Sequence, residues 1–527
     1  MSSALPLYNL KYPLDHFKFT IGIRHKRKFN IMNDFFNKYK YFIFFTLLIL
    51  LYIILDYQSI LFYRPQGIHF IRQTDGLSFV ANYFNNGSGF FEPQVYNLTS
   101  TEGKAACEFP ILYYITSQLY RLFGEQEFIL RLITIIIVSF GFFSLFKLLI
   151  LILNDILYAL IFSFLFLSST VLLYYTNNFL PDASALGFTL IGWYYFYLFK
   201  KLNKKYLILS YSFFTISSLI KVTYFINPIA AIFTIILADI LGKRKLIDVI
   251  KTNFHLLLIF SISSILLLSW NFFVIHYNAI NKDFYFLVSS RPIWNMERQS
   301  IIEVWDYISN YWYSKYYYQS TIHFFAITLL LGIIFIKKAN KAMLIPSIFL
   351  FIGSVFYVLL FYAQFKDHDY YFINLVPTII ILVITAFTAI RDKFPKILNN
   401  YIAKILLLGL AVLSINYARV KLEARYNNNH DEYAEIGTIL SNTRVIIDSL
   451  GIRQNAKIIV FTDKTPNGGL YFLNRKGWNI SDTTEANIKK ISEYKNLGAE
   501  YLVNTTGINF NYAKIWENSK VSIYKIK

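Results

Sequence analysis

The 527-residue sequence contains a single cysteine, Cys107. One thiol excludes an internal disulfide and a cysteine-based metal cluster. The chain also lacks both a Gly-x-Gly-x-x-Gly segment and a phosphate-binding Gly-x-x-x-x-Gly-Lys-Ser/Thr segment, so no motif predicts a nucleotide site. Charged residues make up only 16% of the chain, and we find no internal repeat. These absences argue against a soluble nucleotide-dependent enzyme.

Hydrophobic residues make up 56% of the chain, and the mean hydropathy is +0.43. Several apolar runs reach the roughly 20 residues that a helix needs to cross a bilayer. These runs are continuously apolar, whereas barrel strands alternate between apolar and polar positions. The sequence therefore predicts a polytopic α-helical membrane protein.

Eleven segments are predicted to span the membrane. A basic N-terminal segment, 1–40, precedes them, and a long loop, 63–128, follows the first. This loop contains two amphipathic stretches, near 75–86 and 110–123, and the second suits a helix that lies on the membrane surface. The predicted spans are 41–61, 129–152, 156–174, 182–199, 206–221, 225–241, 253–274, 321–336, 343–363, 371–390 and 399–417.

The net charge of +20 does not indicate nucleic acid, because its placement follows the positive-inside rule. Predicted inner segments hold 22 Lys and Arg in 66 residues, and predicted outer segments hold 9 in 110 residues. The density differs about fourfold. The N-terminus should therefore be cytoplasmic and the 63–128 loop extracytoplasmic. The bias toward Lys, Ile, Asn, Phe and Tyr is typical of a low-GC bacterium, so we expect the bacterial plasma membrane.

A soluble pattern begins after the predicted membrane region, 41–420. Segment 457–461 reads as a buried strand, 486–497 as a helix, and 500–503 and 521–524 as further strands. The sequence therefore predicts a small α/β domain at 421–527. With eleven crossings from a cytoplasmic start, this domain should lie outside the cell.

Isolated polar residues collect at the predicted outer face. Charged groups at this level are costly and tend to face a cavity. Local alternatives exist: Lys221 could extend to the interface, Asp182 could cap a helix, and His368 could be an interfacial aromatic residue. Asp367 and Asp369 also resemble the Asp-x-Asp metal clamp of nucleotide-sugar transferases. The outer polar residues are Arg72, Asp75, Glu108, Asp182, Lys221, Asp367, His368, Asp369 and Tyr370.

Taken together, these residues resemble the GT-C class of membrane glycosyltransferases, which includes protein O-mannosyltransferases and the lipid A aminoarabinose transferase. The resemblance covers about residues 40–420. Phe109 stands where aminoarabinose transferases have a Lys after the Glu that Glu108 matches. The resemblance is carried by Arg72-Gln73-Thr74-Asp75, Glu108-Phe109-Pro110, Tyr113-Tyr114, Phe123-Gly124, Arg131, Pro181-Asp182-Ala183, Lys221-Val222-Thr223, His368-Asp369-Tyr370-Tyr371 and Pro377.

The resemblance implies a sugar donor carried on a polyprenyl phosphate and a single displacement that inverts the anomeric carbon. Asp75 then corresponds to the catalytic base. Substrate-binding positions would be Arg72, Glu108, Asp182, Lys221, His368 and Tyr370. The leaving phosphate needs positive charge, from the outer cations Arg72, Lys221, Arg291 and Arg298 or from a divalent metal ion held by Glu108 and His368.

The partners implied are membrane lipid, the lipid-linked sugar, and an acceptor that is a glycan, a lipid or a protein. Three other functions fit parts of the sequence. A polysaccharide polymerase or ligase shares the lipid-linked donor. A transporter of lipid-linked glycans shares the many spans, although repeats are typical of transporters. A non-enzymatic envelope scaffold would tolerate alanine at the outer charges.

Overall fold

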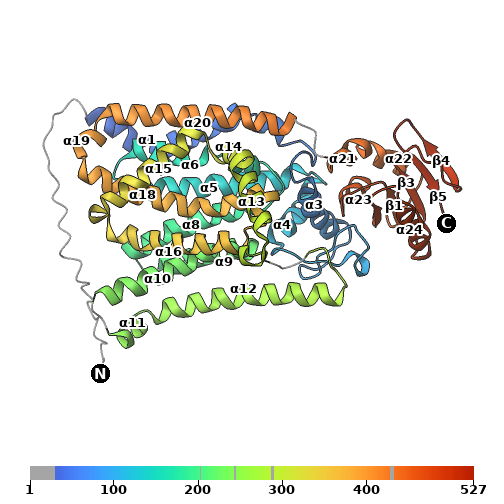
Figure 1. The fold of residues 1–527 in the computed structure, drawn as a ribbon, viewed down its shortest axis with the longest axis horizontal. Coiled ribbons are helices and arrows are strands. Elements are labelled where there is room, and N and C mark those ends of the chain that lie inside the picture. Colours follow the sequence, from blue (N-terminus) through green and yellow to red (C-terminus); the bar gives the residue numbers. More distant parts are fainter. Residues whose placement is uncertain (1–29, 202, 204, 243–244, 287–289, 428–431) are drawn as a thin grey trace, which may run out of the picture.

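The computed structural model describes residues 30–201, 203, 205–242, 245–286, 290–427 and 432–527. Most of the predicted cytoplasmic segment 1–40 therefore lies outside the described residues. Long helices run roughly parallel through one part of the molecule, and a small sheet domain extends from one end of them (Figure 1). The longest bundle helices are α1 (Asn30–Ile54), α5 (Phe128–Leu153), α8 (Asp182–Lys201), α12 (Phe254–Ile280), α16 (Lys341–Leu360), α18 (Val376–Lys393) and α20 (Tyr401–Asn427).

Each predicted span coincides with helical structure. However, fewer than eleven of the described helices are long and apolar enough to cross a membrane. Within the described residues, seven helices are long and apolar enough to cross a membrane, or up to nine if two bent pairs each count as one. The first bent pair joins α6 (Ile156–Leu167) to α7 (Thr170–Thr176) at 80°. The second joins Arg298–Tyr316 to α15 (Gln319–Ile334) at 99°. The predicted count of eleven is therefore not confirmed.

Two predicted spans fall on helices outside this group. Helix α8 is almost entirely buried, and α9 (Lys205–Ile220) is a shorter apolar helix that packs beside it. Helix α10 (Ile226–Leu241) then follows α9 after a 3-10 turn. The hydropathy of α8 and α9 resembles that of lipid-facing spans, because a protein interior and a lipid tail are both apolar.

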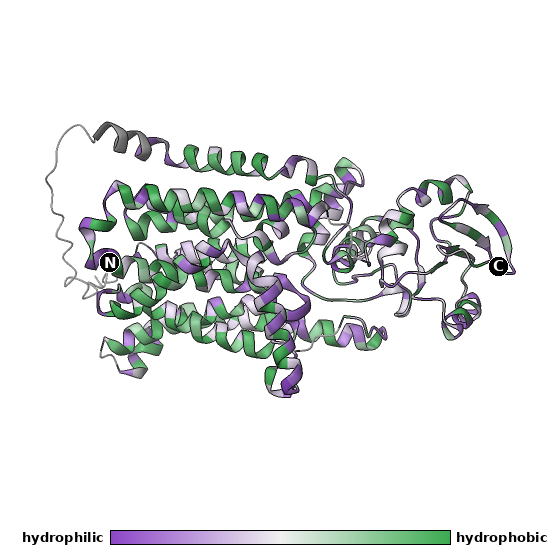
Figure 2. Ribbon diagram, turned by 45° about the horizontal axis from the view of Figure 1, so that its top comes forward, coloured by the Kyte–Doolittle hydropathy of each residue, from purple (hydrophilic) through white to green (hydrophobic). Residues whose placement is uncertain are grey.

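The outer helices of the bundle present apolar side chains over their length. Phe272 on α12 and Leu406 on α20 are 75% and 69% exposed. The bundle helices are coloured mainly as hydrophobic along their length (Figure 2). An apolar surface of this extent marks a membrane region in a protein that has long helices. The fold class predicted from the sequence is thus confirmed.

Helices α5 and α8 approach each other closely at Gly141 and Gly187. A Cβ atom built on Gly141 would lie 2.6 Å from the Cα atom of Gly187. Small residues at such a crossing let two helix backbones come together, and packing then replaces the hydrophobic effect as the source of stability in lipid. This pair fixes α8, which begins at Asp182 near the site described below.

The loop after the first span forms two helices at the end of the bundle where the sheet domain lies (Figure 1). They are α3 (Phe70–Asn85) and α4 (Ile111–Phe123), and they match the two amphipathic stretches expected in this loop. Helix α4 exposes Ile115, Leu122 and Phe123 and buries Leu112 and Tyr113. Helix α3 is buried along most of its length between α4 and the sheet domain.

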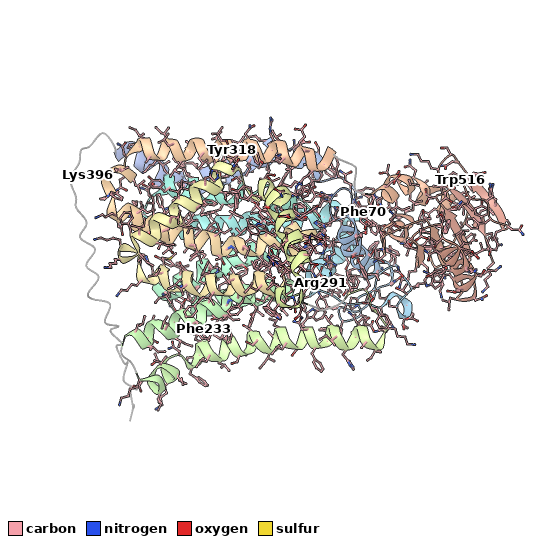
Figure 3. All side chains as sticks on the ribbon, in the orientation of Figure 1. Phe70, Phe233, Arg291, Tyr318, Lys396 and Trp516 are labelled. Atoms are coloured by element: carbon pink, nitrogen blue, oxygen red, sulfur yellow. The ribbon has the colours of Figure 1, made fainter. Side chains whose placement is uncertain are left out.

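The basic residue Lys396 lies at the opposite end from Trp516 of the sheet domain (Figure 3). The α3–α4 loop and the C-terminal domain therefore share one end of the bundle, as the predicted topology requires. Which end faces the cytoplasm stays a prediction from the charge pattern.

The C-terminal domain contains a five-stranded sheet in the order β2-β1-β3-β5-β4. Strand β1 pairs in parallel with β2 and β3, while β5 pairs antiparallel with β3 and β4. Helix α24 (Glu485–Asn496) connects β2 to β3. The strands are β1 (Ile458–Phe461), β2 (Gly477–Ile480), β3 (Tyr501–Asn504), β4 (Ala513–Glu517) and β5 (Ser522–Lys525), and the shorter helices before and between them are α21 (Glu435–Leu440), α22 (Thr443–Ser449) and α23 (Gly468–Leu473).

The sequence pattern indicated β1, β3, β5 and α24 but missed β2 and β4. Strand β2 starts at a glycine, and glycine is depleted in strands. Strand β4 is largely exposed at the sheet edge, so it has no continuous apolar run. The domain's other edge strand, β2, is covered by the α3–α4 loop, where Leu98 N–H donates to the Gly477 carbonyl at 2.8 Å. Covering an edge in this way blocks pairing with other chains.

We expect Gly141→Ala to destabilise the protein by about 1–3 kcal/mol, because the added methyl group has no space at the α5–α8 crossing. Thermal unfolding of the detergent-purified protein measures the change. The matched control is Gly409→Ala on α20, where nothing lies within 4 Å of the new Cβ atom. Equal melting temperatures for the two variants would contradict the proposed close contact.

Candidate functional site

Helix α3 brings Asp75 into the interior at the junction between the bundle and the C-terminal domain. Other buried polar side chains of α3 donate hydrogen bonds to backbone carbonyls of the same helix. Ser78 donates to the Thr74 carbonyl at 2.6 Å, and Asn82 donates to the Ser78 carbonyl at 2.8 Å. Phe70, at the start of the helix, stacks near Phe472 of the C-terminal domain. The helix is thereby held on both sides, and its position fixes that of Asp75.

The Asp75 carboxylate is fully buried and has three polar partners. Tyr285 O–H donates to Oδ2 at 2.8 Å, and the Asn467 amide donates to Oδ1 at 2.8 Å. A guanidinium nitrogen of Arg72, one helical turn earlier, lies 3.8 Å from Oδ2. Burial raises the pKa of Asp75 to about 6, while Arg72 and the two donors oppose that rise. The pKa of Asp75 is therefore about two units above that of an ordinary aspartate.

Arg72 makes its shorter contacts with a second carboxylate, Glu108. One guanidinium nitrogen of Arg72 lies 3.0 Å from both oxygens of Glu108, and Tyr113 O–H donates to Oε1 at 2.5 Å. Burial alone would raise the pKa of Glu108, but Arg72 and Tyr113 hold it at about 2. Glu108 is thus permanently charged at neutral pH, and its negative charge is neutralised by Arg72.

Lys221 lies at the end of α9 and pairs with Asp182 at the start of α8, at 3.0 Å. Its ammonium group also lies 5.0 Å from the ring centre of Tyr370 and 5.1 Å from that of Tyr371. A lysine that only extended to the membrane interface would not need these partners. Lys221 is also close enough to Glu108 to contribute to its low pKa.

His368 connects the Lys221 group to the start of α3. Its ring centre lies 5.2 Å from that of Tyr370 and 5.5 Å from that of His69. Burial, together with the nearby His69 and Lys221, lowers the pKa of His368 to about 3. The imidazole is therefore neutral at physiological pH, and its buried Nδ1 has no partner among the described residues.

Asp369 is fully buried and binds three residues from distant segments. Arg425 donates to Oδ2 at 2.5 Å, Tyr175 donates to Oδ1 at 2.6 Å, and a ring nitrogen of His69 lies 3.2 Å from Oδ1. Asp367, in contrast, is exposed. The two carboxylates do not converge, so the alternative of an Asp-x-Asp metal clamp is wrong. Asp369 ties α20 to the site instead.

The two residues considered as metal ligands have other partners. Glu108 is occupied by Arg72 and Tyr113, and His368 faces aromatic rings. Among the residues that the structure describes, no group of three or more His, Cys, Asp and Glu side chains could hold a metal ion. A metal ion held by Glu108 and His368 therefore stays a prediction.

The predicted site residues form two connected groups near the start of α3. Asp75, Arg72 and Glu108 are connected directly, and Lys221 connects Asp182 to Tyr370 and, through that ring, to His368. Arg291 and Arg298, which were also candidates for phosphate binding, are exposed.

Sequence reasoning missed Tyr285, Asn467, His69 and Arg425, which contact Asp75 or Asp369. Tyr285 and Asn467 lie 210 and 392 residues from Asp75 in the chain. They stand in ordinary loop sequences, so no local signal could identify them. Arg131, quoted within the resemblance, is buried and donates to the carbonyls of Asn177 and Tyr63. Arg131 therefore connects the turn after α7 to the segment that follows the first span.

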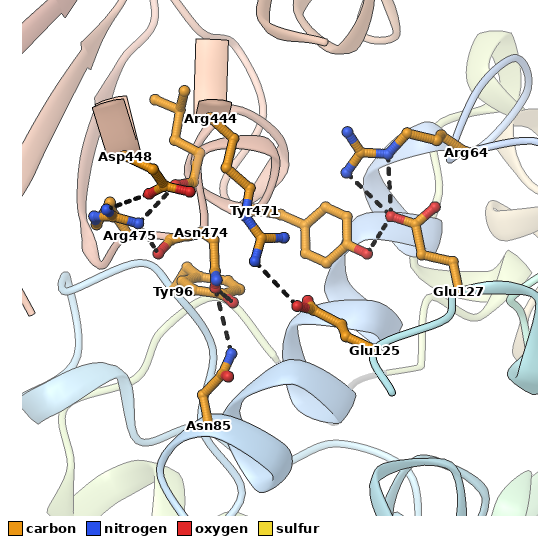
Figure 4. A network of polar contacts seen from close by, with 11 residues as sticks. Arg64, Asn85, Tyr96, Glu125, Glu127, Arg444, Asp448, Tyr471, Asn474 and Arg475 are labelled. Atoms are coloured by element: carbon orange, nitrogen blue, oxygen red, sulfur yellow. Dashed lines mark hydrogen bonds and ion pairs between the residues drawn. The ribbon is translucent and has the colours of Figure 1, made fainter. Parts of the chain in front are cut away.

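The C-terminal domain is attached to the bundle by a polar network (Figure 4). Glu127 accepts hydrogen bonds from Arg64 at 3.1 Å and from Tyr471 at 2.7 Å, and Arg444 pairs with Glu125 at 3.0 Å. The Asn474 oxygen accepts from Tyr96 O–H at 2.5 Å. These contacts fix the domain against the α3–α4 loop, and with it the amide of Asn467 that reaches Asp75.

Three comparisons relate this chain to known proteins. Residues 107–270 match a family model described as dolichyl-phosphate-mannose-protein mannosyltransferase. No curated protein sequence matches the chain significantly. Apo ArnT from Cupriavidus metallidurans is similar in structure, with a TM-score of 0.57, 9% identity and coverage of 91% of this chain and 98% of that one.

Two ligand-bound structures are also similar. ArnT from the same organism bound to undecaprenyl phosphate has a TM-score of 0.53 at 9% identity, covering 92% of this chain and 97% of that one. The oligosaccharyltransferase AglB from Archaeoglobus fulgidus, with an inhibitory peptide and a dolichol-phosphate, has a TM-score of 0.50 at 13% identity, covering 89% and 70%. The chain thus has the fold of ArnT and AglB, and its resemblance to the GT-C membrane glycosyltransferases is confirmed.

Proposed function

We propose that the protein is a membrane glycosyltransferase that moves a hexose or pentose unit from a polyprenyl-phosphate donor to an acceptor at the outer face of the bacterial plasma membrane. The observation that carries this proposal is a buried carboxylate, Asp75, beside the cation of Arg72, in a fold shared with ArnT. A second partly buried cation, Lys221, lies near Glu108, the other partner of Arg72. A transfer of this kind requires both a base and a phosphate-binding charge.

In the proposed reaction, an acceptor oxygen attacks the anomeric carbon of the donor sugar from the side opposite the phosphate. The new C–O bond forms as the bond from the anomeric carbon to the phosphate oxygen breaks, so the configuration inverts. Asp75 takes the acceptor proton. The bond electrons leave with the polyprenyl phosphate. A base whose pKa is about 6 is mostly ionised at pH 7 and still accepts a proton effectively.

The negative charge on the departing phosphate has two candidate partners in this site. Arg72 and Lys221 are cations already placed there, with Tyr370 beside Lys221. The alternative, a divalent ion at Glu108 and His368, would have to displace Arg72 from Glu108. We therefore assign the phosphate to the two side chains, with neutral His368 as a hydrogen-bonding group.

The direct test is transfer by the purified protein in proteoliposomes supplied with undecaprenyl-phosphate sugars. Release of undecaprenyl phosphate together with a glycosylated product would support the function. Uptake of the intact donor across the bilayer without cleavage would identify a transporter instead.

Asp75→Asn should lower the transfer rate by about 10²–10⁴-fold, because a positioned base typically contributes that factor. The variant keeps the shape of the side chain, so binding of undecaprenyl phosphate should be unchanged. Glu92→Gln is the matched control: it is the same type of substitution at an exposed position of the same loop. Wild-type transfer by Asp75→Asn would reject Asp75 as the base.

The pH dependence of kcat/KM should show an acidic limb near pH 6. Asp75 accepts a proton only when it is ionised, so activity should fall about tenfold per pH unit below its raised pKa. A carboxylate with the ordinary pKa of about 3.9 would place this limb some two units lower. A rate that stays constant down to pH 5 would contradict the assignment.

Treatment with EDTA should leave transfer intact, because the proposed phosphate site uses side chains and no metal ion. Lys221→Met should weaken undecaprenyl phosphate binding and lower the rate, because one of the two phosphate-binding charges is lost. Lys366→Met, at an exposed lysine of the same end that pairs with Glu303, is the control and should change neither. Loss of activity in EDTA with recovery on adding Mn²⁺ would favour the metal ion.

A further inference from the structure

His69 immediately precedes α3 and has a backbone conformation that a histidine rarely adopts. Its φ and ψ angles are 60° and 35°, in the left-handed region, where a Cβ atom crowds the following carbonyl oxygen. Its side chain makes no capping hydrogen bond to α3. A residue in such a conformation persists only when its surroundings fix it, and residues of this kind cluster at functional sites. The contacts of the His69 side chain therefore identify what holds the start of α3.

Asp369 is the residue that fixes the His69 side chain. The Nε2 atom of His69 lies 3.2 Å from Oδ1 of Asp369, and an ionised carboxylate can only accept, so Nε2–H is the donor. The imidazole packs edge-on against the Tyr370 ring, with 5.0 Å between the ring centres. The side-chain exposure is 10% for His69 and 0% for Asp369. This hydrogen bond is thus shielded from water, and the low dielectric of the interior strengthens it.

Asp369 is itself anchored by two helices that are separate from α3. Arg425, near the end of α20, donates to Oδ2 at 2.5 Å, and Tyr175, in α7, donates to Oδ1 at 2.6 Å. The Arg425 side chain is buried as well. Separating a buried ion pair leaves an uncompensated charge, which is strongly unfavourable, so the pair keeps Asp369 in place. The carboxylate is therefore a fixed point in the bundle, and His69 attaches the start of α3 to it.

This attachment relates the proposed base to the proposed phosphate site. Asp75 lies on α3, less than two helical turns after His69. Asp369 is followed in the chain by Tyr370, whose ring centre lies 5.0 Å from the Lys221 ammonium group. One short segment of the bundle thus contacts a cation of the phosphate site through Tyr370 and holds α3 through Asp369. The distance between the base and that cation depends on the link between Asp369 and His69.

We propose that Asp369 is a positioning residue that, through His69, sets where α3 places Asp75 relative to the donor phosphate. The inference rests on the function proposed above. Asp369 contacts no reacting atom in this arrangement, because His69, Tyr175 and Arg425 occupy both of its oxygens. Its effect reaches the reaction through the placement of the base. A misplacement of about 1 Å can lower a rate roughly 100-fold, so the link should act on kcat.

The test compares two substitutions of His69 in the full-length protein, in nanodiscs containing an undecaprenyl-phosphate sugar that it turns over. The amide nitrogen of glutamine can take the place of Nε2, so His69→Gln keeps a donor to Asp369. His69→Leu has a similar size and no donor. Both variants carry a Cβ atom and lack the imidazole ring. The backbone strain and the lost contact with Tyr370 are therefore matched between them.

His69→Leu should lower kcat about tenfold or more relative to His69→Gln, because only the leucine variant loses the link to Asp369. The affinity for undecaprenyl phosphate should be the same in the two variants, since neither substitution changes Lys221 or Tyr370. A role confined to folding would give equal kcat values for the correctly folded fractions of both variants.

Tyr175→Phe is the control for damage to the contacts of Asp369. It removes the other donor to the same carboxylate oxygen and keeps the aromatic ring in α7. Like His69→Leu, it should lower the melting temperature, because a buried hydrogen bond is lost. It should leave kcat unchanged, because α7 carries none of the predicted site residues.

The outcomes separate the positioning role from the function on which it rests. Equal kcat values in His69→Gln and His69→Leu would overturn the positioning role, and so would a loss of kcat in Tyr175→Phe as large as that in His69→Leu. Both results would be obtained with an active wild-type protein, so the transferase function would stand. If the wild-type protein cleaves no undecaprenyl-phosphate sugar, the proposed function fails, and the positioning role fails with it.

Discussion

The arrangement of the site depends on one guanidinium group that serves two buried carboxylates. Arg72 lies 3.0 Å from the Glu108 oxygens but 3.8 Å from Asp75. Because electrostatic stabilisation falls with distance, the pKa of Glu108 drops to about 2 while that of Asp75 rises to about 6. Asp75 is also fully buried, whereas the Glu108 side chain is 12% exposed, and the two neighbouring carboxylates thereby acquire different chemical properties. Pairs whose pKa values are pushed apart in this way are typical of catalytic sites.

The difference between the two pKa values requires that Asp75 be shielded from water and held in one orientation. The C-terminal domain contributes to both. The domain covers α3, supplies the Asn467 amide, and is attached through ion pairs and hydrogen bonds at Glu125 and Glu127. Apolar packing accompanies these polar contacts, because Phe70 of α3 and Phe472 of the domain belong to one continuous buried cluster. The domain is therefore held on α3, and with it the Asn467 donor to Asp75.

The two sides of Asp75 differ in a way that fits the two proposed substrates. On the bundle side are Arg72, Lys221 and the ring of Tyr370, which suit an anionic headgroup at the membrane level. On the side of the C-terminal domain are Tyr285 and Asn467, which donate hydrogen bonds to the carboxylate and line a cavity of about 290 Å³. A donor with a lipid tail would approach from the bilayer, and a polar acceptor from water. The carboxylate lies between these two environments.

The sequence by itself determined the membrane class, the helical segments, the α3–α4 loop and the small α/β domain. These follow from hydropathy and periodicity, which are properties of local segments. It also indicated Arg72, Asp75, Glu108 and Lys221, since isolated charges near apolar spans are costly and therefore conspicuous. It did not distinguish lipid-facing helices from buried ones such as α8, because both are apolar.

Only the tertiary structure decided which partners these residues have. Asp75 meets Asn467 across 392 residues, and Asp369 pairs with Arg425 instead of forming a metal clamp with Asp367. The local sequence indicates neither contact, because an asparagine in a loop and an arginine at a helix end are common in those places. The pKa of Asp75 is likewise a product of burial and of neighbours from three segments. The sequence identifies Asp75 as a candidate, whereas the packing of distant segments around it determines its burial, its hydrogen-bond partners and its pKa.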